Sequence, residues 1–235
     1  MLADLLLAAA LAAAPVADAP AAPLAPVTLE YEVLRNGDPM GVSTLVLAQD
    51  ERGEWTLESR TKGTSGLAGL AGASIDERSA FAWREGHPEL RHYRYAQALA
   101  WKDKRRELDV LPDARSIAYD DGKHVGRMPF EDGVMDRHMV VLAIARDVAA
   151  KAEVLEYRVA DKDKLETHRY RIAGTERVTC RAGSFEATRV ERVREHPGRT
   201  TTSWLAAETQ WLPVKIVQRE PDGETIEMRL KSLPR

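Results

Sequence analysis

The side chains that could act as metal ligands or general bases in this chain are its histidines. His92, His124, His138 and His168 lie far apart, without the short His, Cys or Asp spacings that metal sites show. Each lies in or beside a predicted strand or helix and has charged neighbours. We therefore interpret them as surface or hydrogen-bonded histidines, and we predict no metal site.

Two residues are candidate nucleophiles, Ser203 and Cys180. The sequence contains no Gly-x-Ser-x-Gly elbow, although Ser203 could be drawn into a triad with a distant histidine and aspartate. Cys180 lies in a predicted strand, where a free thiol usually acts as a small apolar side chain, and no histidine adjoins it. We predict a protein without catalytic residues.

Two loops could bind a ligand. Gly63 to Gly72 is rich in glycine but lacks the Gly-Lys-Ser/Thr ending of a phosphate-binding loop, so we expect no nucleotide cofactor. Its Leu67 and Leu70 could contact a lipid or a partner, or could be buried under the sheet. Asp161-Lys162-Asp163 lacks the further oxygen ligands and the glycine of a calcium loop, so a solvated turn is expected.

Aromatic residues occur in most of the predicted strands. A concave sheet face that collected several of them would suit a hydrophobic ligand, whereas a filled core would need no ligand. The residues that we propose for contact with an apolar ligand or partner are Tyr31, Trp55, Leu67, Leu70, Trp83, Tyr93, Trp204 and Trp211.

The elements that must position these residues are short alternating segments between Val27 and Leu233. In the first of them, Leu29, Tyr31 and Val33 alternate with glutamates, and Asn36-Gly37 then supplies a tight hairpin turn. Further strands are expected at 42–46, 55–59, 74–84, 90–96, 105–111, 116–120, 154–160, 165–172, 176–181, 185–194, 200–205, 210–219 and 225–233.

A single helix interrupts the strands. Asp136 can accept backbone N–H bonds at a helix start, and Val141, Ile144, Ala145 and Val148 then recur at helical spacing. We predict an amphipathic helix over residues 137–149, packed on the sheet.

The strand pattern predicts a mainly β fold of one domain over residues 27–235. The apolar parity changes within 185–194, which indicates a bulge, and bulges help to curve a sheet. We therefore expect a strongly curved antiparallel sheet or a partly closed barrel of about 13–15 strands around the central helix.

The N-terminus has the features of an export signal. Leu5 to Ala13 is a short apolar run followed by small residues, and Ala19-Pro20-Ala21 favours cleavage after residue 21, which leaves 22–26 as a disordered mature N-terminus. Asp4 replaces the expected positive charge, and an alanine-rich cytoplasmic tail is the alternative. A single cysteine and no later transmembrane segment are compatible with a periplasmic protein.

Composition argues against nucleic acid as a partner. The 34 Lys and Arg residues and the 37 Asp and Glu residues are interleaved, for a formal net charge of -3. Such mixing leaves no basic stripe that could follow a phosphate backbone.

Several short segments occur in a specific order, and they begin at Tyr31, Met40, Ser59, Glu77, Leu90, Asp136, Ala182, Thr202 and Leu212. Their order resembles that of a known family, the exported bacterial proteins of the uncharacterised DUF3108 group. The resemblance covers nearly all of residues 27–233 and implies a curved antiparallel sheet like those of periplasmic lipoprotein carriers. It implies no established reaction.

These observations lead to three hypotheses. The first is an exported, non-catalytic β-protein that binds an apolar molecule, such as a lipid or lipoprotein moiety, in the cell envelope. The second is a periplasmic interaction scaffold with a filled core, which docks another envelope protein through strand edges or through the 63–72 loop. The third is an envelope hydrolase.

Overall fold

The computed structural model describes residues 24–66, 69, 72–99, 103–195 and 198–233. The first eight strands are β1 (Val27–Arg35), β2 (Asp38–Gln49), β3 (Trp55–Gly63), β4 (Ser74–Arg84), β5 (His87–Ala98), β6 (Lys104–Leu111), β7 (Ser116–Asp120) and β8 (Val125–Pro129). The others are β9 (Met135–Asp136), β10 (Leu155–Asp161), β11 (Lys164–Cys180), β12 (Gly183–Val193), β13 (Thr200–Leu205), β14 (Pro213–Arg219) and β15 (Thr225–Ser232). Between β9 and β10 lies the helix α2 (Val140–Ala149).

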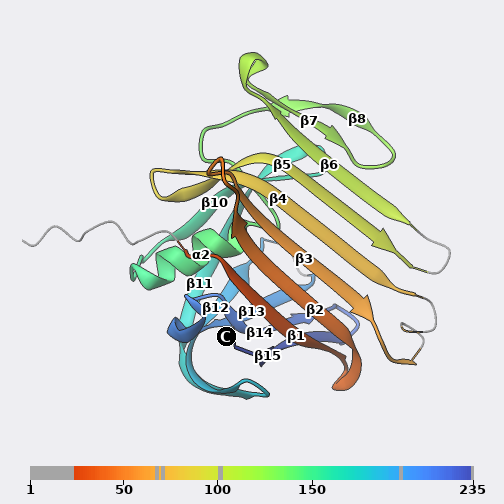
Figure 1. The fold of residues 1–235 in the computed structure, drawn as a ribbon, viewed down its shortest axis with the longest axis vertical. Coiled ribbons are helices and arrows are strands. Elements are labelled where there is room, and N and C mark those ends of the chain that lie inside the picture. The colour runs from red at the N-terminus through yellow and green to blue at the C-terminus, as the bar shows by residue number, and fades with distance from the viewer. Residues whose placement is uncertain (1–23, 67–68, 70–71, 100–102, 196–197, 234–235) are drawn as a thin grey trace, which may run out of the picture.

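All fifteen strands of the described residues belong to one sheet. Figure 1 shows that this sheet is strongly curved. The order is β8-β7-β6-β5-β4-β3-β2-β1-β15-β14-β13-β12-β11-β10-β9, so two meanders meet where β1 pairs with β15. Every pairing is antiparallel except that of β10 with the two-residue β9. The predicted fold class, a large curved antiparallel sheet with a central helix, is confirmed.

Local turn chemistry explains the best-predicted strands. Asn36 and Gly37 both adopt positive φ, as the tight turn between β1 and β2 requires. Strands β4 and β7 have the predicted bounds. By contrast, β8 and β9 were not predicted, because Gly126 and Pro129 weaken the pattern of β8 and because β9 is too short to alternate.

One predicted strand is shorter than expected. β14 begins at Pro213, whereas the sequence predicted a strand from Gln210. Gln210 and Trp211 both have positive φ and follow a short 3-10 turn, Ala207–Thr209. A strand cannot pass through that conformation, so Trp211 lies in a turn.

The helix begins three residues later than predicted. The Asp136 carboxylate accepts the backbone N–H groups of His138 (2.7 Å) and Met139 (2.8 Å), and α2 then starts at Val140. Its side chains Leu142, Ala143 and Ala145 are fully buried. Asp136 therefore accepts backbone amides just before the helix, as predicted, but it does not cap it: the N-cap is Met139, which has no side-chain capping bond. The helix is also buried more completely than an amphipathic surface helix. In the described ranges, no helix is long and apolar enough to cross a membrane.

The sheet curls until its β9 edge lies against β5. The amide of Leu90 donates a hydrogen bond of 2.9 Å to the carbonyl of Val134, just before β9. A register shift between Ile172 and Thr175 accompanies the bend, opposite the segment where the sequence indicated a bulge. It occurs in β11, where Gly174 has a φ of 116°, and it joins two predicted strands into one of 17 residues.

The concave inner face of the sheet has two ends. At the helix end, α2 packs between β5 and β10 (Figure 1). The side chains of Leu29, Leu57, Phe81 and Leu90 are completely buried. At the far end lie the turns between β1 and β2, between β10 and β11 and between β14 and β15. Apolar burial at the helix end therefore holds the curled sheet together.

Candidate functional site

The inner face becomes more polar row by row towards the far end. In the register of β2 to β6, a row at the helix end reads Leu47, Leu57, Ser79, Tyr93, Leu108. The next row reads Leu45, Ser59, Glu77, Tyr95, Arg106, and the one after it Ser43, Thr61, Ile75, Gln97, Lys104. Directly opposed residues of antiparallel strands project to one face, so these rows form a polar inner wall.

Solvent reaches this wall. The side chains of Arg106, Asp161 and Arg137 are 18%, 25% and 35% exposed, although they point towards the opposite half of the sheet. Arg106 Nη1 lies 3.4 Å from Asp161 Oδ1, and the guanidinium groups of Arg106 and Arg137 lie over the ring of Tyr95. The far end is therefore accessible on its inner side, unlike the helix end.

Glu77 is the charged centre of the β4–β5 part of the wall. Its carboxylate accepts a hydrogen bond of 2.7 Å from the Tyr93 hydroxyl and pairs with Arg137 at 3.2 Å. Burial opposes its ionisation, but His138, Arg137 and the Tyr93 hydroxyl outweigh that effect and lower the pKa of Glu77. Burial, with the charge of Glu77, raises the pKa of Tyr93. Glu77 is thus an ionised, fully engaged group rather than a poised general base.

Ser79, His138 and Asp136 lie together beneath Glu77 and resemble a catalytic triad in composition only. Ser79 Oγ and His138 Nδ1 are 3.0 Å apart. In a triad the carboxylate binds the second ring nitrogen of the histidine. Here Asp136 Oδ1 accepts backbone amides instead, and His138 Nε2 has no hydrogen-bond partner among the described residues. Sequence analysis missed this cluster, because Ser79 lies 57 positions before Asp136.

The β11–β12 part of the wall carries positive charge. Arg192 is directly opposite Tyr170, whose ring centroid lies 6.0 Å from that of Tyr157 on β10. His168 is opposite Tyr157 and is buried. Burial lowers the pKa of His168 and Arg194 and raises that of Tyr170, and the charge of Arg192 lowers all three.

Apolar side chains complete the wall on β14 and β15. Ile216 is opposite Met228, and Gln218 is opposite Ile226. Ile216, Met228 and Ile226 are only half-buried, in contrast to Leu230 nearer the helix end, which is fully buried. The far end of the inner face therefore offers solvent-accessible apolar side chains beside arginines.

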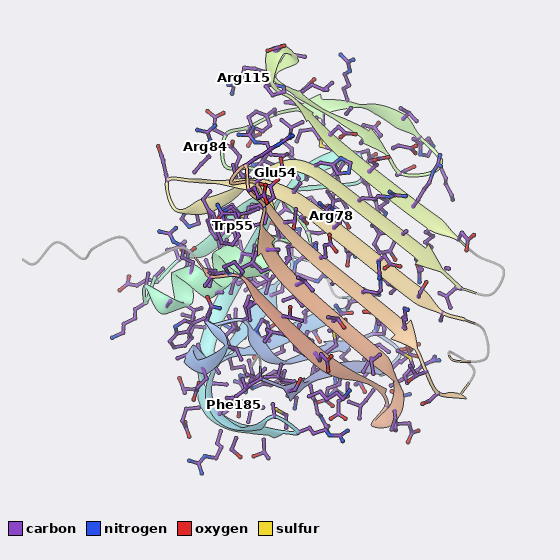
Figure 2. The ribbon with its side chains drawn as sticks, viewed as in Figure 1. Glu54, Trp55, Arg78, Arg84, Arg115 and Phe185 are labelled. Atoms are coloured by element: carbon purple, nitrogen blue, oxygen red, sulfur yellow. The ribbon has the colours of Figure 1, made fainter. Side chains whose placement is uncertain are left out.

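The predicted aromatic contact residues do not form one site. Trp55 and Trp83 meet at the helix end, with ring centroids 6.2 Å apart and Phe81 against both; Trp55 is labelled in Figure 2. Tyr93 is in the polar wall. Tyr31 is buried and donates a hydrogen bond of 2.8 Å to the Pro213 carbonyl.

The remaining predicted contacts lie elsewhere. The indole of Trp204 donates a hydrogen bond to Glu176, and Lys215 Nζ lies 4.8 Å from the Trp204 ring centroid, on the outer face. Trp211 is half-buried in its turn against the core. Leu67 and Leu70, like the predicted signal, lie outside the described residues. The aromatic residues thus mainly fill the core at the helix end.

The two candidate nucleophiles, Ser203 and Cys180, are not assembled with a base. Ser203 is opposite Val190 and Ile216, and Cys180 is opposite Gly183 at the end of β11. Within the described residues, no hydrogen bond joins either side chain to a histidine or a carboxylate. The arrangement that a hydrolase would need at these two positions is therefore not formed there.

One histidine does lie among carboxylates. His92 Nδ1 is 2.7 Å from Asp109 Oδ1, and its Nε2 is 3.6 Å from Glu107 Oε1. The three side chains could hold a metal ion between them. They are partly exposed on the outer face of β5 and β6, and the ring already binds a carboxylate, so this group also fits a histidine held by hydrogen bonding, as the sequence predicted.

Comparison with known proteins places the fold. The model of the DUF3108 family, described as a protein of unknown function, matches residues 29–231. The chain is similar to a crystal structure of a β-barrel-like protein of the domain of unknown function DUF1849 from Brucella abortus, with a TM-score of 0.57, 10% identity, and coverage of 91% of this chain and 99% of that one.

A second solved structure is less similar. It is a candidate lipoprotein from Parabacteroides distasonis, with a TM-score of 0.37, 10% identity, and coverage of 90% of this chain and 96% of that one. No curated protein matches the sequence.

Proposed function

The chain belongs to the DUF3108 family, whose function is unknown, and we propose that it is an exported, non-catalytic protein that binds a lipid-like amphiphile on the inner face of its sheet. The observation that carries this proposal is the contrast between the two ends of that face. The helix end is filled by α2 and buried side chains, whereas the far end leaves Ile216, Ile226 and Met228 half-buried beside charged groups.

An amphiphile fits this surface better than a wholly apolar ligand. A purely apolar molecule would cover Arg106, Arg137 and Arg192 and would remove their charges from water at high cost. A molecule with an acyl part and a polar head can place the acyl part on the apolar side chains of β14 and β15. Its head can then stay near the guanidinium groups and the solvent.

Export is part of the proposal. The apolar run Leu5 to Ala13, followed by small residues, supports secretion, and lipid-like amphiphiles are abundant in the cell envelope. Residue positions also support the non-catalytic role, because Glu77 is fully engaged and Ser203 and Cys180 have no base beside them in the described structure.

A pair of variants tests where the ligand binds. Ile226→Asp places a carboxylate on the inner face, whereas Val193→Asp places one on the outer face, where Val193 is 48% exposed. We expect Ile226→Asp to weaken binding of dodecyl maltoside at least tenfold in isothermal titration calorimetry. The dodecyl chain of the detergent would have to displace water from the new carboxylate, which is costly. Val193→Asp should bind as the wild type does.

The opposite results would count against the proposal. If both variants bound dodecyl maltoside with wild-type affinity while remaining folded by circular dichroism, the acyl chain would not lie on β14 and β15. If the wild type did not bind it at all, the inner face would not be an amphiphile site.

The interaction scaffold is a second candidate, because β8 lies at the edge of the sheet. Its only neighbour in the strand order is β7, and Val125 at its start is 79% exposed. An unpaired edge can accept a strand from another protein. Val125→Pro, which removes an edge N–H, would impair such docking and would leave the inner face unchanged.

A further inference from the structure

Three inward-facing side chains at the far end have the chemistry of an anion site. We propose that Arg192, Arg194 and His168 form a subsite for a phosphate-like oxyanion. This inference rests on the proposed function and specifies the head group of the amphiphile. Free phosphate and a phosphorylated lipid head share the chemistry that the subsite would recognise.

The register of β11 and β12 places the three groups together. Arg192 is opposite Tyr170, and continuation of the same register sets Arg194 beside His168. Tyr170 and His168 face Leu155 and Tyr157 on β10, which are buried on the inner side. Arg194 is exposed and directly follows Val193, the last residue of β12. Continued alternation of the strand by one residue would place it on the same face as Arg192.

The two inner arginines differ from their outer neighbours in having no carboxylate. On the outer face of the same strands, Arg169 pairs with Glu156 at 2.7 Å and Arg171 pairs with Glu191. Within the described residues, neither Arg192 nor Arg194 forms an ion pair. Burial, together with the charges of Arg192 and Arg199, lowers the pKa of Arg194, which reflects the crowding of positive charge.

His168 is a buried ring on the same inner face, with its Nε2 3.5 Å from Glu166 Oε2. Its side chain is 4% exposed, and neither ring nitrogen has a hydrogen-bond partner in the described part of the chain. Buried polar groups of this kind normally have a hydrogen-bond partner, because a buried donor or acceptor without a hydrogen bond lowers stability. Burial and the charge of Arg192 lower the pKa of His168 to about 4, so at neutral pH the ring offers one N–H donor and no charge of its own.

Two carboxylates lie near the subsite. Burial lowers the pKa of His168, and the charges of Glu166 and Asp161 both oppose that effect. Asp161 also pairs with Arg106 at 3.4 Å. Glu166 Oε2 is 3.5 Å from His168 Nε2 and would repel an anion. The same carboxylate pairs with Lys164 Nζ at 2.6 Å, which offsets its charge. The balance around His168 therefore stays positive, with Arg192 and Arg194 uncompensated.

A tetrahedral oxyanion matches this donor set. One guanidinium group can bind both oxygens of a planar carboxylate through two parallel N–H donors. A tetrahedral phosphate has oxygens outside one plane, and two guanidinium groups with a ring N–H could bind three of them. The half-buried Ile226 and Met228 lie on the same inner face, so a phosphorylated amphiphile could use both surfaces.

Isothermal titration of the full-length mature protein with three probes tests this inference. The probes are dodecyl phosphate, dodecyl maltoside and inorganic phosphate, with both detergents below their critical micelle concentrations. We expect dodecyl phosphate to bind at least tenfold more tightly than dodecyl maltoside, and the difference to shrink as salt is added. If inorganic phosphate bound with the same affinity as dodecyl phosphate, the result would support the subsite but would identify its ligand as a free anion.

Variants of the arginines make the test specific. Arg192→Gln/Arg194→Gln should lose the preference for dodecyl phosphate, with an affinity for dodecyl maltoside within twofold of the wild type. Arg171→Gln removes one positive charge from the outer face of the same strands and should keep the preference. Arg192→Lys/Arg194→Lys should retain part of the preference for dodecyl phosphate, because the positive charges remain but the paired N–H donors of the guanidinium groups are lost.

The outcomes separate this inference from the proposed function. If both detergents bound equally and the double glutamine variant bound as the wild type does, the subsite would be refuted and the amphiphile site would stand. Phosphate binding that needs Arg192 and Arg194, without binding of dodecyl maltoside, would support the subsite and refute the acyl site. If no probe bound, both proposals would fail.

Discussion

At Asp136, burial of the side chain in the fold opposes ionisation of its carboxyl group. The side chain is fully buried, and this burial raises its pKa to about 7, against the lowering effect of the amides of Met139 and His138. The folded state therefore holds the proton more tightly than the unfolded chain, whose pKa is near 3.8. The resulting stabilisation is complete below pH 3.8 and is lost as the pH rises to about 7.

This conflict gives a prediction for Asp136→Asn, which keeps the Oδ1 acceptor but cannot ionise. Between pH 5 and pH 8, the unfolding free energy of the variant should rise relative to that of the wild type by about 2–3 kcal/mol, given ~1.4 kcal/mol per pKa unit. Urea denaturation at both pH values measures the difference. A difference that is the same at pH 5 and pH 8 would show that Asp136 is not the titrating group.

At the same scale, the sequence revealed the role of Asp136 but not the polar wall. Asp136 precedes an apolar periodic run, which is a local signal. Glu77 and Arg192 look like ordinary charged residues of a wet strand face, and only the register with Tyr95 and Tyr170 shows that they point inwards. A shift of one residue would reverse that assignment, so one strand alone could not settle it.

Among the elements, α2 depends on polar contacts at its C-terminal end as well as on apolar packing. The Asp147 carboxylate accepts a hydrogen bond of 2.8 Å from the Tyr157 hydroxyl on β10 and lies 3.0 Å from His87 Nε2 at the start of β5. Next to it, Arg146 donates a hydrogen bond to the Gly86 carbonyl. The helix is thus fastened to both halves of the curled sheet.

A double-mutant cycle measures that fastening. Asp147→Ala and Tyr157→Phe should each lower the unfolding free energy by about 1–3 kcal/mol, because each leaves a partly buried polar group unpaired. The double variant should lose about 0.5–2 kcal/mol less than the sum of the two. Strict additivity in thermal and urea denaturation would mean that the two side chains do not act together.

Strand prediction succeeded where alternation and turn residues agreed. The segment 74–84 lies between the glycine-rich 63–72 stretch and the Glu85-Gly86 turn and forms β4 with the predicted bounds. β9 was missed because two residues carry no period, and its pairing with β10 depends on the curl of the whole sheet. The start of β14 was misplaced because the positive φ of Gln210 leaves no mark in hydropathy.

At the scale of the whole molecule, curvature divides one continuous sheet into two functional regions. α2 and the aromatic residues near Trp55 fill the helix end, which stabilises the curl. The far end keeps solvent-accessible polar and apolar side chains on its inner face. The sequence predicted the curve and the helix, but it assigned ligand contact to the aromatic residues, whereas the structure places most of these in the core.

Binding at the far end should also stabilise the whole fold. A ligand that binds only the folded state raises stability by RT ln(1 + [L]/Kd), which is about 2.7 kcal/mol at a hundredfold excess over Kd. Dodecyl phosphate should therefore raise the melting temperature of the wild type in a concentration-dependent way. The same concentrations should leave the melting temperature of Ile226→Asp unchanged. An equal rise in melting temperature for both proteins would mean that the ligand binds elsewhere.

The most direct test of the central claim is native mass spectrometry of the mature protein purified from the cell envelope without detergent. We expect a stoichiometric adduct with the mass of a lipid, which tandem dissociation releases as an anion. Ile226→Asp should lose this adduct, and Val193→Asp should keep it. Protein that carries no such adduct, and that takes up none when incubated with vesicles of envelope phospholipid, would contradict the central claim.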